Sequence, residues 1–163
     1  MISPSYCQTM ARYNARMNDQ LYNACAAIPD QQRRADMKLF FKSIHGTLDH
    51  LMYGDIAWLS RFMDQDDKVP EFGGILYPDF SELADTRKVW DQNIIDWADR
   101  LEQSWLESDF SYVSKVDGKS RTKPAWLLAT HMFNHSTHHR GQLTAALRQL
   151  DIDFGVTDLP FVL

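Results

Sequence analysis

The run ATHMFNHSTHHRGQL, residues 129–143, carries four of the six histidines of this chain. An α-helix advances by 100° per residue, so with His131 at zero the apolar residues of this segment point between about 60° and 120°. His139, at about 80°, and His135, at about 40°, lie within that buried stripe, whereas His131 and His138 lie on its flank. Two hydrogen-bonded core histidines are the simpler interpretation. However, burying two imidazoles on one stripe without a ligand is unfavourable, so the spacing favours a metal site.

This run belongs to the last of four segments with the amphipathic spacing of helices. Asp36 and Ser81 are suitable N-caps for the second and third, and Pro124 suits the first turn of the fourth. Tryptophans repeat along the apolar stripe of the third segment, where we expect them in the core. The helices are expected at residues 5–27, 36–64, 81 through at least 105, and 124–150. The pattern predicts an all-α fold, a four-helix bundle, in a single domain over residues 1–163.

The connections between these segments are distinct in composition. Residues 64–80 contain two prolines, a glycine pair and several acids, which is typical of a loop. Residues 108–123 alternate in polarity around Asp117 and Gly118, which predicts a short hairpin-like insertion with a two-residue turn before the last helix. The tail from Asp151 is irregular but apolar enough to dock on the bundle.

Composition and charge exclude several classes of function. The net charge is −5 and the basic residues are scattered, so no nucleic-acid-binding surface is expected. No apolar run is long enough for a membrane span, and the N-terminus has no secretory signal pattern. On one helix Cys7 and Cys25 would lie about 27 Å apart, too far for a disulfide. We therefore expect free thiols and a cytoplasmic location.

A metal held by two histidines would bind weakly, so a third ligand is needed from elsewhere. The candidates are His45 and His50, and helical periodicity does not decide between them. Gly46 and Gly54 lie one turn on either side of His50 and would allow a neighbouring helix to approach there. Asp55 points away from His50, so a buried hydrogen-bonded acid or a subunit contact is the better interpretation for it.

Three stretches resemble the DinB-like family, a damage-inducible family that shares only its name with a DNA polymerase. They are SIHGTLDHLMYGDIAWLSRF (residues 43–62, with Asp55, Trp58 and Arg61), HMFNHSTHHRGQL (131–143) and RYNARMN (12–18). The resemblance covers essentially the whole chain. It implies a four-helix bundle, often a homodimer, with one divalent metal ion held by three histidines. At the matching positions these are His50, His135 and His139.

Three imidazoles with open coordination positions suit zinc or nickel, with iron possible, and disfavour calcium and magnesium. The resemblance implies a metal-dependent enzyme of the thiol S-transferase type, acting on a small molecule with a low-molecular-weight thiol as possible cofactor. The alternatives are a metal-dependent hydrolase and a non-catalytic metal-binding or ligand-binding protein of the stress response.

Several polar residues near the histidines have supporting roles in this hypothesis. Gln142 either orients a ligand or makes an interhelical hydrogen bond, and His138 is a solvent-facing or supporting residue rather than a ligand. Asn14 and Asn18 are expected to make interhelical or capping hydrogen bonds. Arg140 points near 180° on the helical wheel, which predicts a surface or interface ion pair. His45 is a candidate pocket wall.

Overall fold

Short polar side chains determine where three of the long helices begin. In the computed structural model, which describes residues 2–163, helix α1 (Pro4–Ala26) follows Ser3, whose hydroxyl accepts from the Tyr6 amide. Ser43 caps α3 (Ile44–Phe62) by accepting from the Gly46 amide. Asp79 caps α4 (Phe80–Asp99) in the same way. Each oxygen satisfies one of the amides that a helix N-terminus leaves without a partner.

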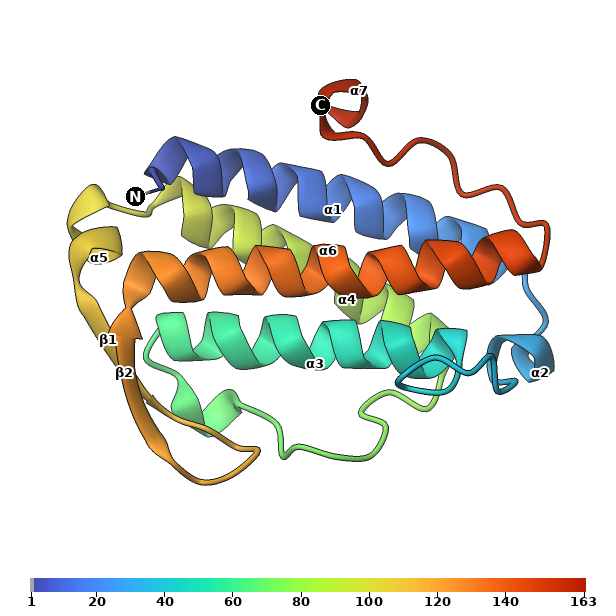
Figure 1. Cartoon of the computed structure of the whole chain (residues 1–163), viewed down its shortest axis with the longest axis horizontal. Coiled ribbons are helices and arrows are strands. Elements are labelled where there is room, and N and C mark those ends of the chain that lie inside the picture. The colour runs from blue at the N-terminus through green and yellow to red at the C-terminus, as the bar shows by residue number, and fades with distance from the viewer. Residues whose placement is uncertain (1) are drawn as a thin grey trace.

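The fourth long helix, α6 (Ala125–Gln149), has no side-chain cap. Its first amide, that of Ala125, donates instead to the carbonyl oxygen of Ser108. The four long helices of residues 2–163 lie side by side (Figure 1), with α1 packed mainly on α4 and α3 mainly on α6. Further contacts join α1 to α6 and α3 to α4, so each long helix has two long neighbours. The fold is mostly helical, as predicted.

The predicted start of the second helix is wrong. Asp36 accepts a hydrogen bond from the Lys38 amide, which closes a turn and not a helix. Lys38 and Lys42 have φ angles of 60° and 67°, a left-handed backbone that a right-handed helix cannot contain. A short helix, α2 (Asp30–Arg33), precedes this turn. The better N-cap in the sequence was therefore Ser43, which directly precedes the helix that carries His50.

The third helix also differs from its prediction. Asp79, not Ser81, is the N-cap, and the Ser81 hydroxyl donates to the Asp79 carboxylate. The helix ends at Asp99, and Trp105 lies on a separate short helix, α5 (Gln103–Glu107). The rings of Trp97 and Trp105 still meet across this break, with centroids 5.7 Å apart. The apolar spacing of the sequence therefore continues past the end of the helix. Periodicity alone could not distinguish such a break from a continuous helix.

The expected hairpin is present, with a longer turn than predicted. Strands β1 (Asp109–Val113) and β2 (Ser120–Pro124) pair antiparallel and form the only sheet in residues 2–163. Val113 pairs with Ser120, so six residues connect the strands, and the prediction of a two-residue turn is wrong. The turn closes when the Gly118 amide donates to the Ser114 carbonyl oxygen, and Gly118 supplies a φ of 68°.

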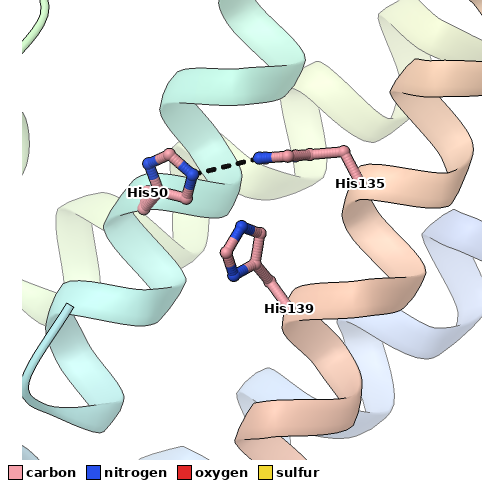
Figure 2. Close-up of side chains that lie close together, drawn as sticks. All are labelled: His50, His135 and His139. Carbon is pink, nitrogen blue, oxygen red and sulfur yellow. Dashed lines mark hydrogen bonds between the residues drawn. The ribbon is translucent and has the colours of Figure 1, made fainter. Parts of the chain in front are cut away.

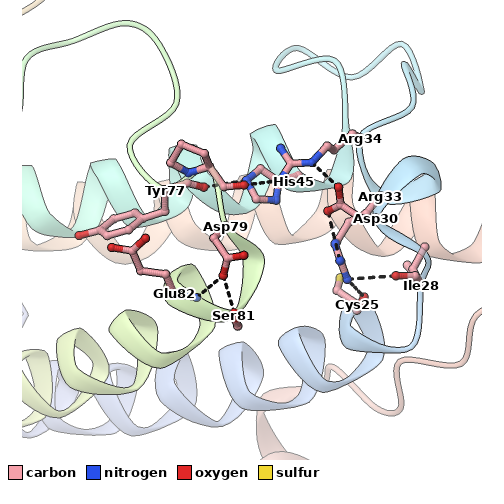
Figure 3. Close-up of polar contacts among 11 residues, drawn as sticks. Cys25, Ile28, Asp30, Arg33, Arg34, His45, Tyr77, Asp79, Ser81 and Glu82 are labelled. Carbon is pink, nitrogen blue, oxygen red and sulfur yellow. Dashed lines mark hydrogen bonds and ion pairs between the residues drawn. The ribbon is translucent and has the colours of Figure 1, made fainter.

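The loop between α3 and α4, which includes a short 3₁₀ helix, η1 (Asp66–Lys68), is fixed at its C-terminal end. The buried Asp49 carboxylate accepts hydrogen bonds from the amides of Leu76 and Tyr77, at 3.0 and 2.8 Å. The Tyr77 carbonyl oxygen lies 2.8 Å from Nε2 of His45 (Figure 3). Figure 3 also shows Arg33, which donates to two carbonyl oxygens at the end of α1 and holds the α1–α2 corner.

The cysteines and the C-terminal tail agree with their predictions. Cys7 and Cys25 are free, buried and carried by the same helix, α1. The tail docks on the long helices, where the Thr157 carbonyl oxygen accepts from the Tyr13 hydroxyl, and it ends in a short helix, α7 (Leu159–Val162). No helix of the described chain has the length and apolarity to cross a membrane.

Candidate metal centre

Three imidazole rings meet between α3 and α6 (Figure 2). His50 comes from α3, and His135 and His139 come from successive turns of α6. The ring centroids lie 5.0 Å apart for His50 and His135, 4.7 Å for His50 and His139, and 4.5 Å for His135 and His139. Each ring offers one nitrogen within 4.8 Å of the nitrogens offered by the other two. The three rings come from segments 85 residues apart in sequence, and their nitrogens lie close enough together to be compatible with one shared ion.

A glycine permits this close approach. A Cβ atom on Gly54 would lie 2.7 Å from Cε1 of His135, closer than packed atoms come. The absence of a side chain there lets the His135 ring lie against the α3 backbone. On its other side, the His50 ring is stacked on Phe41, with centroids 3.6 Å apart. The prediction that Gly54 admits another helix is confirmed. Gly46 instead accommodates the carbonyl oxygen of Phe41.

The three rings are in the neutral form that metal ions require. Burial, followed by the neighbouring imidazoles, lowers the pKa of His135 to about 3. Burial and His139 lower the pKa of His50 to about 4. Burial also lowers the pKa of His139. At neutral pH the rings therefore keep their lone pairs, and Nε2 of His50 lies 3.0 Å from Nε2 of His135.

Gln142 orients one of these rings. Its side-chain carbonyl oxygen lies 3.0 Å from Nδ1 of His139 and accepts the ring proton there, which leaves Nε2 of His139 with the free lone pair. Its amide nitrogen donates to Nε2 of His138 at 3.1 Å. Gln142 thus bridges two histidines of its own helix and makes no interhelical bond. His138 is exposed, as expected, and touches the cluster through Gln142 and the His139 ring.

Three further polar residues lie near the site without belonging to the histidine cluster. Asp55 is buried away from the histidines, with Arg87 at 2.8 Å and Ser136 at 3.1 Å, so its interpretation as a buried hydrogen-bonded acid is confirmed. His45 lies outside the cluster and bonds to the Tyr77 carbonyl oxygen. His131 lies on the flank and contacts the rings of Trp58 and His135.

One prediction about α6 is wrong. Arg140 is not at the surface: it is 4% exposed and donates to the Asn14 side-chain oxygen. The helical wheel placed it opposite the buried stripe, but α6 packs on α1 as well as on α3 and buries a second face there. Asn14 and Asn18 make interhelical hydrogen bonds, as expected, and Asn18 donates to Asp91 at 2.8 Å.

Two cavities adjoin the histidines. One, of about 130 Å³, lies between Phe41, His50 and the end of the α3–α4 loop. The other, of about 210 Å³, borders both His50 and His135 and reaches the β1–β2 hairpin. Both share Tyr53 and the loop residue Phe72. The sequence did not predict these lining residues, because their place at the site depends on how a loop and a hairpin fold over α3. Residue periodicity does not encode this arrangement.

Comparisons with known proteins agree with this geometry. The family model described as "DinB family" matches residues 1–162. A protein named "Protein DinB" from Bacillus subtilis (strain 168) is 26% identical over 161 residues, which cover 90% of this chain and 87% of that protein. The three close histidines, at the positions where the resemblance implied ligands, are compatible with a metal-binding site.

Proposed function

This chain belongs to the DinB family, and we propose that it binds one divalent metal ion through His50, His135 and His139. The observation that carries the proposal is the convergence of three neutral imidazoles within 4.8 Å, with no carboxylate or thiol of the described chain in the cluster. Metal–imidazole bonds of about 2.0–2.1 Å need only small ring rotations from this arrangement. An all-nitrogen donor set suits zinc or nickel, with iron possible.

We further propose a metal-dependent enzyme of the thiol S-transferase type that acts on a small molecule. When bound, the metal ion would supply Lewis acidity that favours the thiolate form of a low-molecular-weight thiol. The chain supplies the rest: Gln142 fixes the His139 ring, and the two cavities beside His50 hold the organic part of a substrate.

The carboxylates near the cavities favour thiol transfer over hydrolysis. Water bound to a metal ion can ionise near neutral pH, but a base that takes its proton assists hydrolysis, and the acids lining the two cavities in residues 2–163 are Asp49 and Glu71. Asp49 already accepts two backbone hydrogen bonds, and Glu71 pairs with Lys115 at 2.9 Å. A thiol is acidic enough to be deprotonated without such a base.

Metal uptake tests the first part. Calorimetric titration of tag-free protein with Zn²⁺ and Ni²⁺ should give one equivalent. Replacing His50, His135 or His139 by alanine should weaken binding at least about hundredfold. His131→Ala is the matched control, because His131 lies on the same helix beside the cluster without belonging to it. Equal affinity in His131→Ala and His135→Ala would refute the assignment.

Turnover tests the second part. Thermal shift with a panel of low-molecular-weight thiols, with and without zinc, should identify a thiol that raises the midpoint only in the metal-loaded protein. That thiol should then be transferred to chlorodinitrobenzene, and His135→Ala should abolish the reaction. Transfer that survives in His135→Ala removes the metal from the mechanism. Hydrolysis of an ester or amide panel without thiol transfer supports the hydrolase alternative, and metal uptake with neither activity supports a binding protein of the stress response.

The same proposal includes a four-helix bundle formed by α1, α3, α4 and α6, a homodimer and a cytoplasmic location. The pairwise packing of the long helices supports the bundle, and the two free thiols support a reducing compartment. The homodimer rests on the family resemblance. Sedimentation equilibrium of the purified chain should give twice the monomer mass of 19.0 kDa.

A further inference from the structure

Arg61 is a buried cation without an acidic partner. It lies near the end of α3 and is 6% exposed. Its Nη1 donates to the Ala57 carbonyl oxygen at 3.1 Å, and its Nη2 lies 3.5 Å from the Val113 carbonyl oxygen. Arg61 forms no ion pair within residues 2–163; the Asp66 carboxylate acts on it only electrostatically, from beyond ion-pairing distance. Two carbonyl contacts, one of them long, leave most of the five guanidinium N–H groups free to bind something else.

The other buried arginines are partnered by side chains. Arg33 pairs with Asp30 at 3.3 Å, and Arg87 pairs with Asp55 at 2.8 Å. Arg140 donates to the side-chain oxygens of Asn14 and Thr137. Burying a charge without compensation is costly, so a buried arginine with carbonyl and aromatic contacts but no ion pair indicates a missing anion.

The surroundings of Arg61 indicate where that anion lies. Arg61 lines the same cavity of about 210 Å³ as His50 and His135. Its guanidinium carbon lies 5.2 Å from the Trp58 ring centroid and 5.6 Å from that of Tyr112. The cavity wall between the arginine and the histidines is largely aromatic, and includes Tyr53, Trp58, Phe72 and Tyr112. One cavity thus offers a cation at one end, imidazoles at the other and apolar surface between them.

We propose that Arg61 binds the anionic group of an organic anion with an aromatic or apolar body, whose other end lies at the three histidines. The proposal rests on the proposed function and names its substrate class. The planar guanidinium suits a carboxylate, which it can bind through two parallel N–H groups. The other cation that lines this cavity, Lys115, is less suitable because its ammonium group already pairs with Glu71 at 2.9 Å.

Phenylacetate and its neutral analogue phenylacetamide are the probes that test this proposal. Each is titrated at neutral pH into metal-free protein and followed by NMR. Metal-free protein is used so that a carboxylate–metal bond cannot produce the preference. Wild type should bind phenylacetate about tenfold or more tightly than phenylacetamide, as a charge-assisted hydrogen-bonded pair implies. Equal affinities in wild type would overturn the proposal, with no variant required.

Variants assign the preference to Arg61. Arg61→Gln should bind the two probes equally, and Arg61→Lys should keep part of the preference because it keeps the charge. Arg12→Gln is the matched control: it makes the same charge change at an exposed arginine that pairs with Asp99. A preference that persists in Arg61→Gln, or disappears in Lys115→Gln instead, would overturn the assignment. If Arg61→Gln proves unfolded by circular dichroism, Arg61→Lys and Lys115→Gln decide.

Titration of the same proteins with zinc separates this proposal from the proposed function. Zinc uptake should be equal in wild type and Arg61→Gln, because Arg61 is not one of the proposed metal ligands. Zinc uptake without a preference for phenylacetate refutes only the role of Arg61. A preference that depends on Arg61, in a protein that takes up no zinc, supports the anion site and refutes the metal centre.

Discussion

Helix α3 contributes to two polar clusters of opposite character, one shared with α6 and the other shared with α4. On one side lie His50, His135 and His139, the imidazole cluster, which is neutral and has no oppositely charged partner. On the other side lie Asp55, Arg87 and Asp91, the charge cluster, in which Arg87 pairs with Asp55 at 2.8 Å and with Asp91 at 2.9 Å. The two clusters are close in sequence, since Ser136, next to His135, donates to Asp55.

The difference shows how a structural polar group is distinguished from a binding one. Most of the charge cluster is paired internally: Arg87 contacts both carboxylates, and Asn18 and Ser136 add hydrogen bonds, while Nε of Arg87 has no partner within residues 2–163. The imidazole cluster brings three lone-pair donors together with one hydrogen bond among them, between His50 and His135, and two cavities adjoin it. The charge cluster should therefore matter for folding, and the imidazole cluster for binding.

Removing one member of each cluster is the strongest test of this difference between the two clusters. Asp55→Ala should lower the free energy of unfolding by about 3–5 kcal/mol, because it leaves Arg87 buried with half its compensation. His135→Ala should change it by less than about 1 kcal/mol in metal-free protein. Urea unfolding at neutral pH measures both variants. Equal losses would mean that the imidazole cluster is structural.

The charge cluster should also respond to pH. Burial, acting against its ion pair with Arg87, raises the pKa of Asp91 to about 6. A carboxyl group whose pKa is raised on folding contributes stability that is complete below its unfolded pKa and is lost as the pH rises through the folded value. The stability of wild type relative to Asp91→Asn should therefore fall between about pH 4 and pH 6, by roughly 3 kcal/mol at most. A difference that is constant or rises over this range would contradict the assigned direction.

Substitutions at two helical glycines test the packing around the imidazole cluster. Gly54→Ala should destabilise the protein by about 1–3 kcal/mol and weaken metal binding, because the new Cβ displaces the His135 ring. Gly141, on α6, has open space around the same position. Gly141→Ala should stabilise the protein by about 0.5–1 kcal/mol and leave metal binding unchanged. Thermal unfolding and zinc titration of both variants provide the check, and a stabilising Gly54→Ala would contradict the close contact.

The last prediction concerns the orientation of the His139 ring. Gln142→Ala should weaken zinc binding about tenfold, or about 1.4 kcal/mol, with little change in stability, because the His139 ring loses the acceptor for its Nδ1 proton. Gln142→Glu keeps an acceptor and should retain the affinity. His138→Ala, which leaves the Gln142 oxygen in place, serves as control. The hydrogen bond has no orienting role if Gln142→Ala binds zinc as wild type does.

These clusters also show what the sequence could predict. His135 and His139 follow from the 3.6-residue period, because both share the apolar stripe of one helix. His50 needed the family resemblance, because its position relative to α6 depends on the packing of two helices. Arg140 was misplaced for a related reason: a helical wheel with one buried stripe does not describe a helix buried on two sides. Arg61 and its cavity depend on a hairpin and a loop, whose positions relative to α3 leave no trace in residue spacing.

The two cysteines have a consequence for the proposed thiol chemistry. Cys7 and Cys25 are fully buried in α1, and burial raises their pKa values to about 11 and about 12. An alkylating agent or oxidant that enters the cavities beside His50 therefore meets no thiolate of the protein itself. Under the proposed function, the sulfur atom that reacts must therefore be brought by a separate small molecule.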